Sequence, residues 1–332
     1  MKFKKILILI FFICISLSLI SCGKKTQHYD IDKYILEIPY KENFKVLQLT
    51  DIHLGNKDNQ KLHLDFMDLT IKDANADFIV VTGDLFTFAD KVTAKRLFKF
   101  LDSYEIPWTV TFGNHDEQCY FSIDWLTKYL SNYGSNCKFI DLQDDDVHGN
   151  ANFAINLVDG STIKEQVIIM DSNRYNYGEY IGYDYIKQDQ IDWYESLINY
   201  TTEKNGGVKV PSMIACHIPV PEFDEAWNLA ENDELTVLEG DKREKCCCPD
   251  PEYDLGFFDK VVELGSTNLI LVGHDHINDY CIQYKGVYLS YGVKSTNRIY
   301  YEEGLLGGQT ITIKPDQTLE FNRILHNYEE VK

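Results

Sequence analysis

The sequence predicts an α/β fold with parallel strands, because strand-like and helix-like segments alternate along it. Apolar, β-branched runs lie within 44–53, 77–84 and 106–116, and each ends in polar residues. The segments between them, 59–76 and 89–105, carry apolar residues at helical spacing. The polar ends recur about every 30 residues, which is the length of a βαβ crossover unit. Parallel strands joined in this way end at one edge of a sheet, so these polar residues are expected to meet in space.

Further elements are expected along the rest of the chain. Apolar runs predict strands within 137–144, 152–159, 167–173, 211–219 and 267–276, and helical spacing predicts a helix over 189–204. The last part, 279–295 and 309–325, alternates like antiparallel strands. No repeat or linker divides the chain, so residues 43–332 are expected to form one domain.

The N-terminus resembles a bacterial lipoprotein signal. Three lysines among the first five residues precede an apolar or hydroxyl-bearing run over 6–20, which is shorter than the roughly 20 residues that a membrane span needs. The run ends in LISC, which is similar to the lipobox. This predicts a signal peptide over 1–21, lipidation of Cys22, a tether over 22–42 and anchoring to the outer face of the cytoplasmic membrane. The alternative, an ordinary signal peptide or short anchor, also exports the protein.

Composition limits the partners of the protein. Its formal net charge of −20 argues against non-specific nucleic-acid binding and against a polybasic membrane contact, so an anionic substrate needs a local positive centre. Nine cysteines include Cys14 and Cys22 at the N-terminus, and the odd number that remains leaves at least one thiol free or paired between chains. The run 246–248 could bind a third metal ion, or one of its thiols could pair with Cys281. Free thiols or a structural disulfide are the favoured interpretation.

Five expected strand ends carry titratable or amide side chains. They are Asp51 and His53; Asp84; Asn114, His115 and Asp116; His217; and His274 and His276. The D-x-H and H-x-H spacings place both side chains on one side of a strand. Carboxylate, imidazole and amide ligands suit Mn, Fe or Zn rather than calcium. One ion needs only about four protein ligands, so the set indicates two ions that share a carboxylate, and Asp84 is the natural bridge.

These motifs, D-x-H, G-D, G-N-H-D, a lone H and G-H-x-H in this order, resemble those of the calcineurin-like metallophosphoesterases over residues 44 to about 300. The resemblance implies two central mixed β-sheets flanked by helices, an α/β/β/α sandwich. It also implies two metal ions, the first bound by Asp51, His53, Asp84 and His276, and the second by Asp84, Asn114, His217 and His274. His217 is the least constrained of these, since only ACHIP and its order place it.

The resemblance further implies a mechanism for phosphate esters. His115 would lie over the scissile phosphate, where it stabilises the transition state or protonates the leaving oxygen, and Asp116 would orient it. A water or hydroxide that bridges the ions would attack phosphorus in line. The positive charge of two divalent ions exceeds the negative charge of the Asp51 and Asp84 carboxylates. The metal-loaded site would therefore be a positively charged pocket in an acidic protein.

Stretches outside the metal core resemble one branch, the purple-acid-phosphatase-like proteins of the cell-cycle-regulator type. They are PWTVTFGNHDE, MDSNRY, YDYIKQDQIDWYE, HIPVPEF, LGFFDKVVELG and GHDHINDYC. True purple acid phosphatases carry a tyrosine ligand to ferric iron three residues after the bridging aspartate, and this sequence has Thr87 there. The resemblance therefore does not imply a fixed ferric iron site in this protein.

Other residues have weaker signals. The charged segment 228–254 is expected to form a loop over the pocket, and tyrosines within 175–185 could stack on a base or sugar, although packing is their commoner role. Arg174 and Arg298 could bind a substrate phosphate or form surface ion pairs. Gly273 is expected to allow a close approach of the chain. Asp275 should point away from the metals, and His28, His63, His148 and His326 are expected at the surface.

The predicted function is metal-dependent hydrolysis of phosphomonoesters or phosphodiesters by an exported, lipid-anchored protein. The alternative is a non-catalytic surface lipoprotein that uses its metals for binding or sensing. That alternative gives no reason for His115 and Asp116 to accompany Asn114. The physiological substrate, the metal pair, the preference for monoesters or diesters and the oligomeric state do not follow from the sequence.

Overall fold

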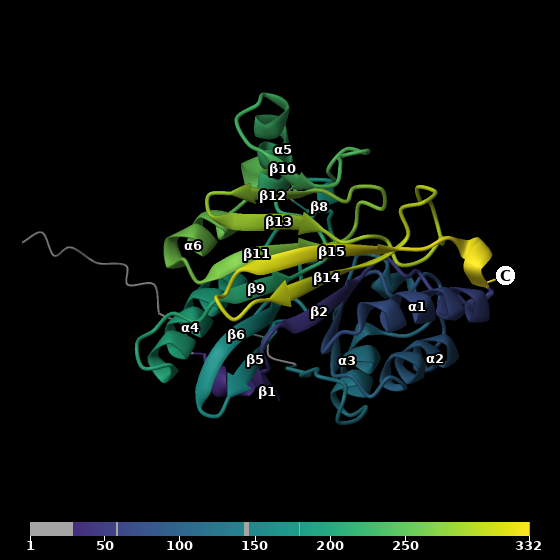
Figure 1. Ribbon diagram of the computed structural model, residues 1–332, viewed down its shortest axis with the longest axis horizontal. Coiled ribbons are helices and arrows are strands. Elements are labelled where there is room, and N and C mark those ends of the chain that lie inside the picture. The colour runs from purple at the N-terminus through teal and green to yellow at the C-terminus, as the bar shows by residue number, and fades with distance from the viewer. Residues whose placement is uncertain (1–28, 58, 143–145, 179, 332) are drawn as a thin grey trace, which may run out of the picture.

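The computed structural model describes residues 29–57, 59–142, 146–178 and 180–331 (Figure 1). The predicted signal peptide and Cys22 lie outside these ranges. Every helix within them is too short or too polar to span a bilayer.

The larger of the two main sheets has eight strands in the order β1-β5-β6-β9-β11-β13-β12-β10. Their bounds, in that order, are Ile35–Pro39, Phe153–Asp159, Thr162–Ile169, Ser212–Ala215, Thr267–Val272, Val287–Tyr291, Cys281–Tyr284 and Val237–Glu239. Neighbours from β6 to β13 are parallel, whereas β5 is antiparallel to β6 and β12 is antiparallel to β13 and β10. The carboxyl ends of β9 and β11 therefore lie at one edge.

The smaller sheet has five strands in the order β15-β14-β2-β3-β4. Their bounds are Leu319–Leu325, Gly307–Ile313, Phe44–Leu49, Phe78–Thr82 and Trp108–Thr111. The strands β2, β3 and β4 are parallel, as their crossover spacing predicts, and β14 is antiparallel to β2 and β15. A separate hairpin joins β7 (Tyr175–Asn176) to β8 (Gly182–Tyr183).

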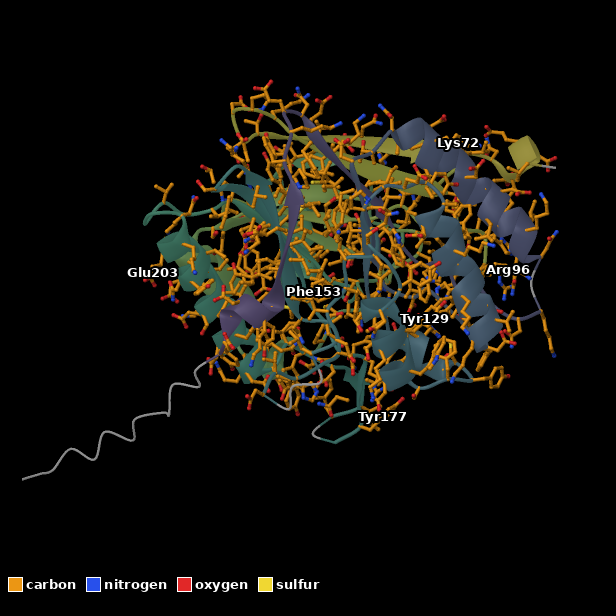
Figure 2. The ribbon with its side chains drawn as sticks, turned by 90° about the horizontal axis from the view of Figure 1, so that it is seen from below. Lys72, Arg96, Tyr129, Phe153, Tyr177 and Glu203 are labelled. Atoms are coloured by element: carbon orange, nitrogen blue, oxygen red, sulfur yellow. The ribbon has the colours of Figure 1, made fainter. Side chains whose placement is uncertain are left out.

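Helices cover the outer faces of the two sheets (Figure 1). The smaller sheet packs against α1 (Gln60–Ala74), α2 (Lys91–Asp102) and α3 (Ile123–Ser131), and the larger against α4 (Gln188–Lys204), α5 (Glu222–Glu231) and α6 (Phe257–Leu264). Short 3-10 helices are η1 (Ile31–Tyr34), η2 (Asp116–Gln118), η3 (Pro251–Tyr253) and η4 (Tyr328–Val331). Figure 2 shows Lys72 of α1 and Arg96 of α2 on the flank opposite Glu203 of α4.

Two hydrophobic clusters lie on the two faces of the larger sheet. Along β5, Ile155 belongs to the cluster that contains α1 to α3, and its neighbour Ala154 belongs to the cluster that contains α4 to α6. Val167 and Ile168 of β6 divide in the same way, because successive side chains of a strand face opposite sides. These layers confirm the predicted α/β/β/α sandwich.

Three sequence-based expectations differ from the structure. Residues 31–39, assigned to the tether, form η1 and β1, and β1 pairs with β5, so the folded part begins before residue 43. The strand expected over 137–144 does not form in its described part, where Cys137 makes only an isolated bridge to Trp108. His63 is buried rather than exposed, and its Nδ1 lies 3.0 Å from the Tyr328 hydroxyl.

Candidate metal centre

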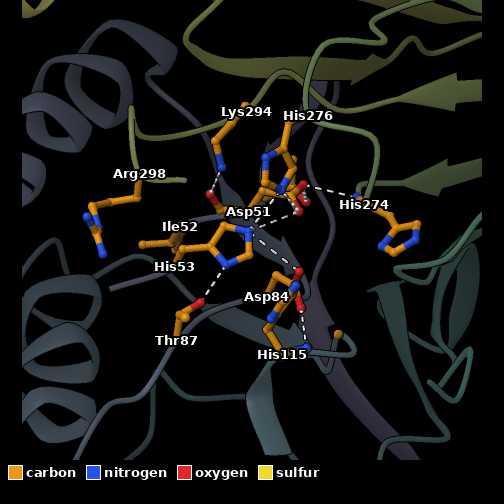
Figure 3. A network of polar contacts seen from close by, with 12 residues as sticks. Asp51, Ile52, His53, Asp84, Thr87, His115, His274, His276, Lys294 and Arg298 are labelled. Atoms are coloured by element: carbon orange, nitrogen blue, oxygen red, sulfur yellow. Dashed lines mark hydrogen bonds and ion pairs between the residues drawn. The ribbon is translucent and has the colours of Figure 1, made fainter. Parts of the chain in front are cut away.

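The predicted ligands follow the carboxyl ends of five strands, three in the smaller sheet and two in the larger. They are Asp51 and His53 after β2, Asp84 after β3, Asn114 after β4, His217 after β9, and His274 and His276 after β11. All seven are buried. The two sheets thus direct their polar ends to one place, and Figure 3 shows five of these side chains together.

The first group comprises Asp51, His53, Asp84 and His276. The Nε2 atoms of His53 and His276 lie 2.9 Å apart. His276 Nε2 is 3.4 Å from Asp51 Oδ1, and His53 Nε2 is 3.5 Å from Asp84 Oδ2. Two ligands that share an ion with bonds of about 2.1 Å lie roughly 3.0 to 3.4 Å apart, so these spacings match one metal ion.

The second group comprises Asp84, His217 and His274. His217 Nε2 lies 3.3 Å from Asp84 Oδ2 and 3.3 Å from His274 Nδ1. The same oxygen of Asp84 therefore faces histidines of both groups. This is the arrangement expected of a carboxylate that bridges two ions, and it is the role that the sequence assigned to Asp84.

Buried polar atoms show that a pair of cations fits this site. Asp51 Oδ1 and Asn114 Oδ1 have no hydrogen-bond partner among the described residues. A buried oxygen without a partner costs free energy of order 1–3 kcal/mol, and a bound cation removes that cost. The Asn114 oxygen is free for this role because its amide nitrogen donates to the Tyr175 hydroxyl at 2.7 Å.

Similarity to known proteins agrees with this geometry. The family model for the calcineurin-like phosphoesterases matches residues 44–278, from the first strand of the smaller sheet to just beyond the last predicted ligand. The chain belongs to this family. The fold also resembles that of a dimetal phosphatase from Danio rerio, with a TM-score of 0.53 and 13% identity over 87% of this chain and 100% of that protein.

Curated relatives of the chain include purple acid phosphatases. Probable inactive purple acid phosphatase 14 of Arabidopsis thaliana is 27% identical over 83% of this chain and 77% of its own length. The phosphatase DCR2 of Saccharomyces cerevisiae is 24% identical over 72% of this chain, which spans 45% of that protein. The names of these relatives agree with the resemblance to purple-acid-phosphatase-like proteins.

In this calcineurin-like phosphoesterase, hydrogen bonds hold the outer nitrogens of three ligand histidines. The Nδ1 atoms of His217 and His276 donate to the carbonyl oxygens of Thr82 at 2.8 Å and Tyr300 at 2.9 Å. His53 Nδ1 lies 2.8 Å from the hydroxyl of Thr87, the residue at the purple acid phosphatase tyrosine position. A proton on Nδ1 leaves Nε2 free to bind metal, so these partners select the ligating tautomer.

The backbone of the phosphoesterase site is unusual. Asp51, His53, Asp84 and His274 have φ angles of 52°, 50°, 50° and 75°, in the left-handed region that favours glycine. Such conformations persist where the surrounding structure enforces them, and they concentrate at functional sites. Four of the seven predicted ligands therefore have this strained backbone conformation.

Three glycines let these segments approach each other. A Cβ on Gly273 would lie 1.9 Å from Thr50 Oγ1, as the expected close approach requires. A Cβ on Gly113 would lie 2.2 Å from Asp84 Oδ1, and one on Gly83 would lie 2.6 Å from His217 Cγ. A side chain at any of these positions would displace a ligand or the segment that holds it.

The segment after β13 supports the first ligands and was not identified from the sequence. Lys294 is buried, and its Nζ donates to the carbonyl oxygen of Asp51 at 2.8 Å (Figure 3). Ser295 exchanges two hydrogen bonds with Thr50, and Thr296 Oγ1 donates to Ile52 O at 2.8 Å. The only sequence signal was a lysine in an otherwise weakly polar run.

Local charges keep the carboxylates ionised. Burial opposes the charge on Asp51, but the close approach and charge of His276 hold its pKa well below the usual range. Burial likewise opposes the charge on Asp84, and the charge of His217 holds its pKa below the ordinary value. Both carboxylates are therefore available as anionic ligands at neutral pH.

The histidines differ in charge. Burial lowers the pKa of His274 to about 3 and that of His53 well below its usual range, so both are neutral ligands. Burial also acts to lower the pKa of His217, but the charge of Asp84 raises it to about 10. At neutral pH the metal-free His217 therefore carries a proton on Nε2. An ion that binds this nitrogen must displace that proton, as occurs when metals bind to protonated ligands.

His115 lies beside the metal groups, but Asp116 does not orient it. The ring of His115 is 5.2 Å from that of His53, and its backbone N–H donates to Asp84 Oδ1 at 2.9 Å. Its Nδ1 lies 2.8 Å from Gln118 Oε1. Asp116 is fully buried and accepts hydrogen bonds from the N–H groups of Phe86 and Gly113, so it stabilises the loop instead. The orienting contact that was expected from Asp116 is thus made by Gln118.

The other candidates around the site have mixed outcomes. Tyr175 reaches Asn114, and the ring of Tyr183 lies 4.4 Å from that of His274, so the hairpin borders the metal centre. Arg174 forms an ion pair with Glu117. Asp275 belongs to neither of the two groups above and accepts a hydrogen bond from the Tyr291 hydroxyl at 2.6 Å, although its carboxylate lies within 4.8 Å of a ring nitrogen of His274.

Proposed function

We propose that this protein hydrolyses phosphate esters with two metal ions bound by the residues described above. The observation that carries the proposal is the shared oxygen of Asp84, which lies 3.5 Å from His53 Nε2 and 3.3 Å from His217 Nε2. Mn, Fe or Zn ions bound there would supply a hydroxide nucleophile at neutral pH and stabilise charge on the reacting phosphate. The substrate is a phosphomonoester or phosphodiester.

The chain itself would position the phosphate and move a proton. Gln118 holds Nδ1 of His115 and leaves its Nε2 free to face the substrate. From there His115 can donate a proton to the leaving oxygen or a hydrogen bond to the transition state. Lys294 adds a buried basic group behind Asp51, and burial lowers its pKa to about 8.

Charge supports binding of an anionic substrate at this place alone. The protein has a net charge of −20, so its surface repels phosphate in general. The positive charge of two divalent ions exceeds the negative charge of the Asp51 and Asp84 carboxylates, so the metal-loaded site would attract phosphate. The metal-free protein should therefore bind phosphate poorly.

The relatives support both this proposal and its alternative. The yeast relative is named a phosphatase, whereas three plant relatives are named probable inactive purple acid phosphatases. The second candidate function is accordingly a metal-binding module without catalysis. The presence of His115 next to Asn114, with its ring fixed by Gln118, favours catalysis in this chain.

Hydrolysis by metal-loaded protein separates the two candidates. Protein loaded with Mn, Fe or Zn should hydrolyse an activated aryl phosphate monoester or diester, and His115→Ala should slow turnover by about 100-fold or more with little change in metal content. His326→Ala is the matched control and should leave turnover unchanged. Folded, metal-loaded protein without turnover on either ester would refute catalysis and leave the binding module.

Metal content tests the bridge independently of activity. Asp84→Asn keeps the size of the side chain but removes the negative charge that both groups share. Elemental analysis should show loss of both ions from this variant, whereas Asp77→Asn should keep them, because Asp77 contacts Lys41 and the backbone N–H of Lys45 rather than a metal ligand. A variant at Asp84 that retains both ions would contradict the bridging role.

We further propose that the protein is exported and anchored by lipid on Cys22. The support is the apolar run before LISC, whose last residue is the acceptor. In a bacterial host fed a labelled fatty acid, the wild type and Cys14→Ser should incorporate label, and Cys22→Ser should not. Incorporation by the Cys22 variant, or none by the wild type, would refute the anchor.

A further inference from the structure

Three consecutive cysteines, Cys246, Cys247 and Cys248, lie between β10 and η3. Neighbours in an extended segment face opposite sides, and residues two apart face the same side. Accordingly, Cys246 and Cys248 line the same cavity. Cys247 faces the metal-ligand turn, where its Sγ lies within 4.8 Å of ligand atoms of His274 and Asp275.

The Cys246–Cys248 pair is accessible from one side. Cys246 is only 3% exposed, whereas Cys248 is partly exposed. Both line a cavity of about 880 Å³ whose wall also includes Tyr183 and Glu222. Cys248 is thus the sulfur that solvent reaches, whereas Cys246 is buried.

Hydrogen bonds connect this pair to the metal ligands. The N–H of Cys247 lies 3.3 and 3.2 Å from the two carboxylate oxygens of Asp275. The hydroxyl of Tyr291 donates to Asp275 at 2.6 Å and lies 3.2 Å from Cys246 Sγ. Asp275 stands between His274 and His276 in the chain, so any displacement of the cysteine segment reaches the turn that carries both ligands.

We propose that Cys246 and Cys248 form a redox-active dithiol that closes to a disulfide and thereby weakens metal binding at His274 and His276. Residues two apart in an extended chain lie about 6.6 Å apart, at the long end of the range for disulfides. Formation of the disulfide shortens the distance between the Cα atoms of Cys246 and Cys248. It also moves the peptide of Cys247, whose N–H donates to Asp275. The ligand turn loses that hydrogen bond in the oxidised form.

The oxidant is a small-molecule disulfide. The Cys248 thiolate attacks one sulfur of that disulfide, forms a mixed disulfide and releases one thiolate. The Cys246 thiol then loses its proton and displaces the second thiolate from Cys248. One disulfide is reduced to two thiols, and the Cys246–Cys248 pair is oxidised, so electrons and protons balance.

Thiol mapping of the full-length protein tests the disulfide. After equilibration in mixtures of oxidised and reduced glutathione, free thiols are alkylated and the protein is cleaved with trypsin after Lys245 and Lys260. The peptide 246–260 contains three cysteines and should carry one alkyl group under oxidising conditions, with the mass of two hydrogens lost. Cys247→Ser should keep this disulfide and Cys248→Ser should abolish it. Three alkylated cysteines at every glutathione ratio, or a link to Cys281, would overturn the proposal.

Cobalt binding tests the connection to the metal centre without reference to catalysis. Oxidised protein should bind Co²⁺ roughly tenfold more weakly than reduced protein, the size of effect seen when groups that support metal ligands are lost. In Cys248→Ser the affinity should not depend on the glutathione ratio. Equal affinities of oxidised and reduced wild type would refute the connection. A sulfur-to-cobalt absorption band that Cys248→Ser removes would make the pair a metal site instead.

Discussion

Replacement of Thr87 by valine tests how a hydrogen bond prepares a histidine to bind metal. Valine keeps the branched shape of the buried threonine but removes the hydroxyl that lies 2.8 Å from His53 Nδ1. Without that partner the imidazole can place its proton on Nε2, the atom that faces His276. The protein then has to change the tautomer before the first ion binds.

The expected magnitude follows from the loss of such a supporting contact, which weakens metal affinity about 10–100-fold, or about 1.4–2.7 kcal/mol. The effect should be confined to one of the two ions. His217 Nδ1 is held by the backbone carbonyl of Thr82, which the substitution at Thr87 leaves in place.

Competition with a chromophoric chelator for Mn²⁺ or Zn²⁺ measures both affinities. Thr87→Ser retains a hydroxyl and should bind within a few-fold of wild type, whereas Thr87→Val should show one weakened site. Circular dichroism verifies that both variants are folded. If folded Thr87→Val binds both ions as tightly as the wild type, the hydroxyl does not set the tautomer of His53.

Two further predictions concern stability. Burial raises the pKa of Glu165 to about 8 from an ordinary 4.5, so the folded state holds a proton that the unfolded state has lost, and stability falls as pH rises between these values. Glu165→Gln should remove this pH dependence, raising the free energy of unfolding by about 3 kcal/mol near pH 7 but by little near pH 4.5. Urea denaturation at several pH values measures this. If the free energy of unfolding of the variant and of the wild type changes equally with pH, the reasoning is contradicted. Gly83→Ala should destabilise the fold by at least about 2 kcal/mol and weaken metal binding, because its Cβ meets His217 at 2.6 Å. Gly206→Ala, also at positive φ but in open space, should lose only about 1 kcal/mol in thermal melts, and equal losses would exclude the contact with His217.

The sequence predicted which side chains gather at the candidate site, because this information is local. A spacing of two residues places Asp51 with His53, and His274 with His276, on one side of the chain, and parallel strands place the separate motifs at one edge. Asp84 carried its own signal because it is the lone carboxylate at its strand end. The two groups that share its oxygen bear out that interpretation.

Features that depend on distant pairing were missed. The strand β1 has the short, largely apolar sequence ILEIP but follows a polar segment, and its pairing with β5 places it in the sheet. The contact between Thr87 and His53, and the hydrogen bond from Lys294 to Asp51, join residues without a fixed spacing. Asp116 was assigned by adjacency to His115, but two backbone N–H groups occupy its carboxylate.

The left-handed backbone at Asp51, His53, Asp84 and His274 has an evolutionary consequence. Each of these residues carries strain of about 1–3 kcal/mol that glycine would relieve, so the ligands oppose the stability of the metal-free fold. A lineage that stopped using metal would gain stability by exchanging these residues for glycine or asparagine. The four positions therefore provide a sequence test for lost metal binding among purple-acid-phosphatase-like relatives, and in this chain all four still carry the strained ligands.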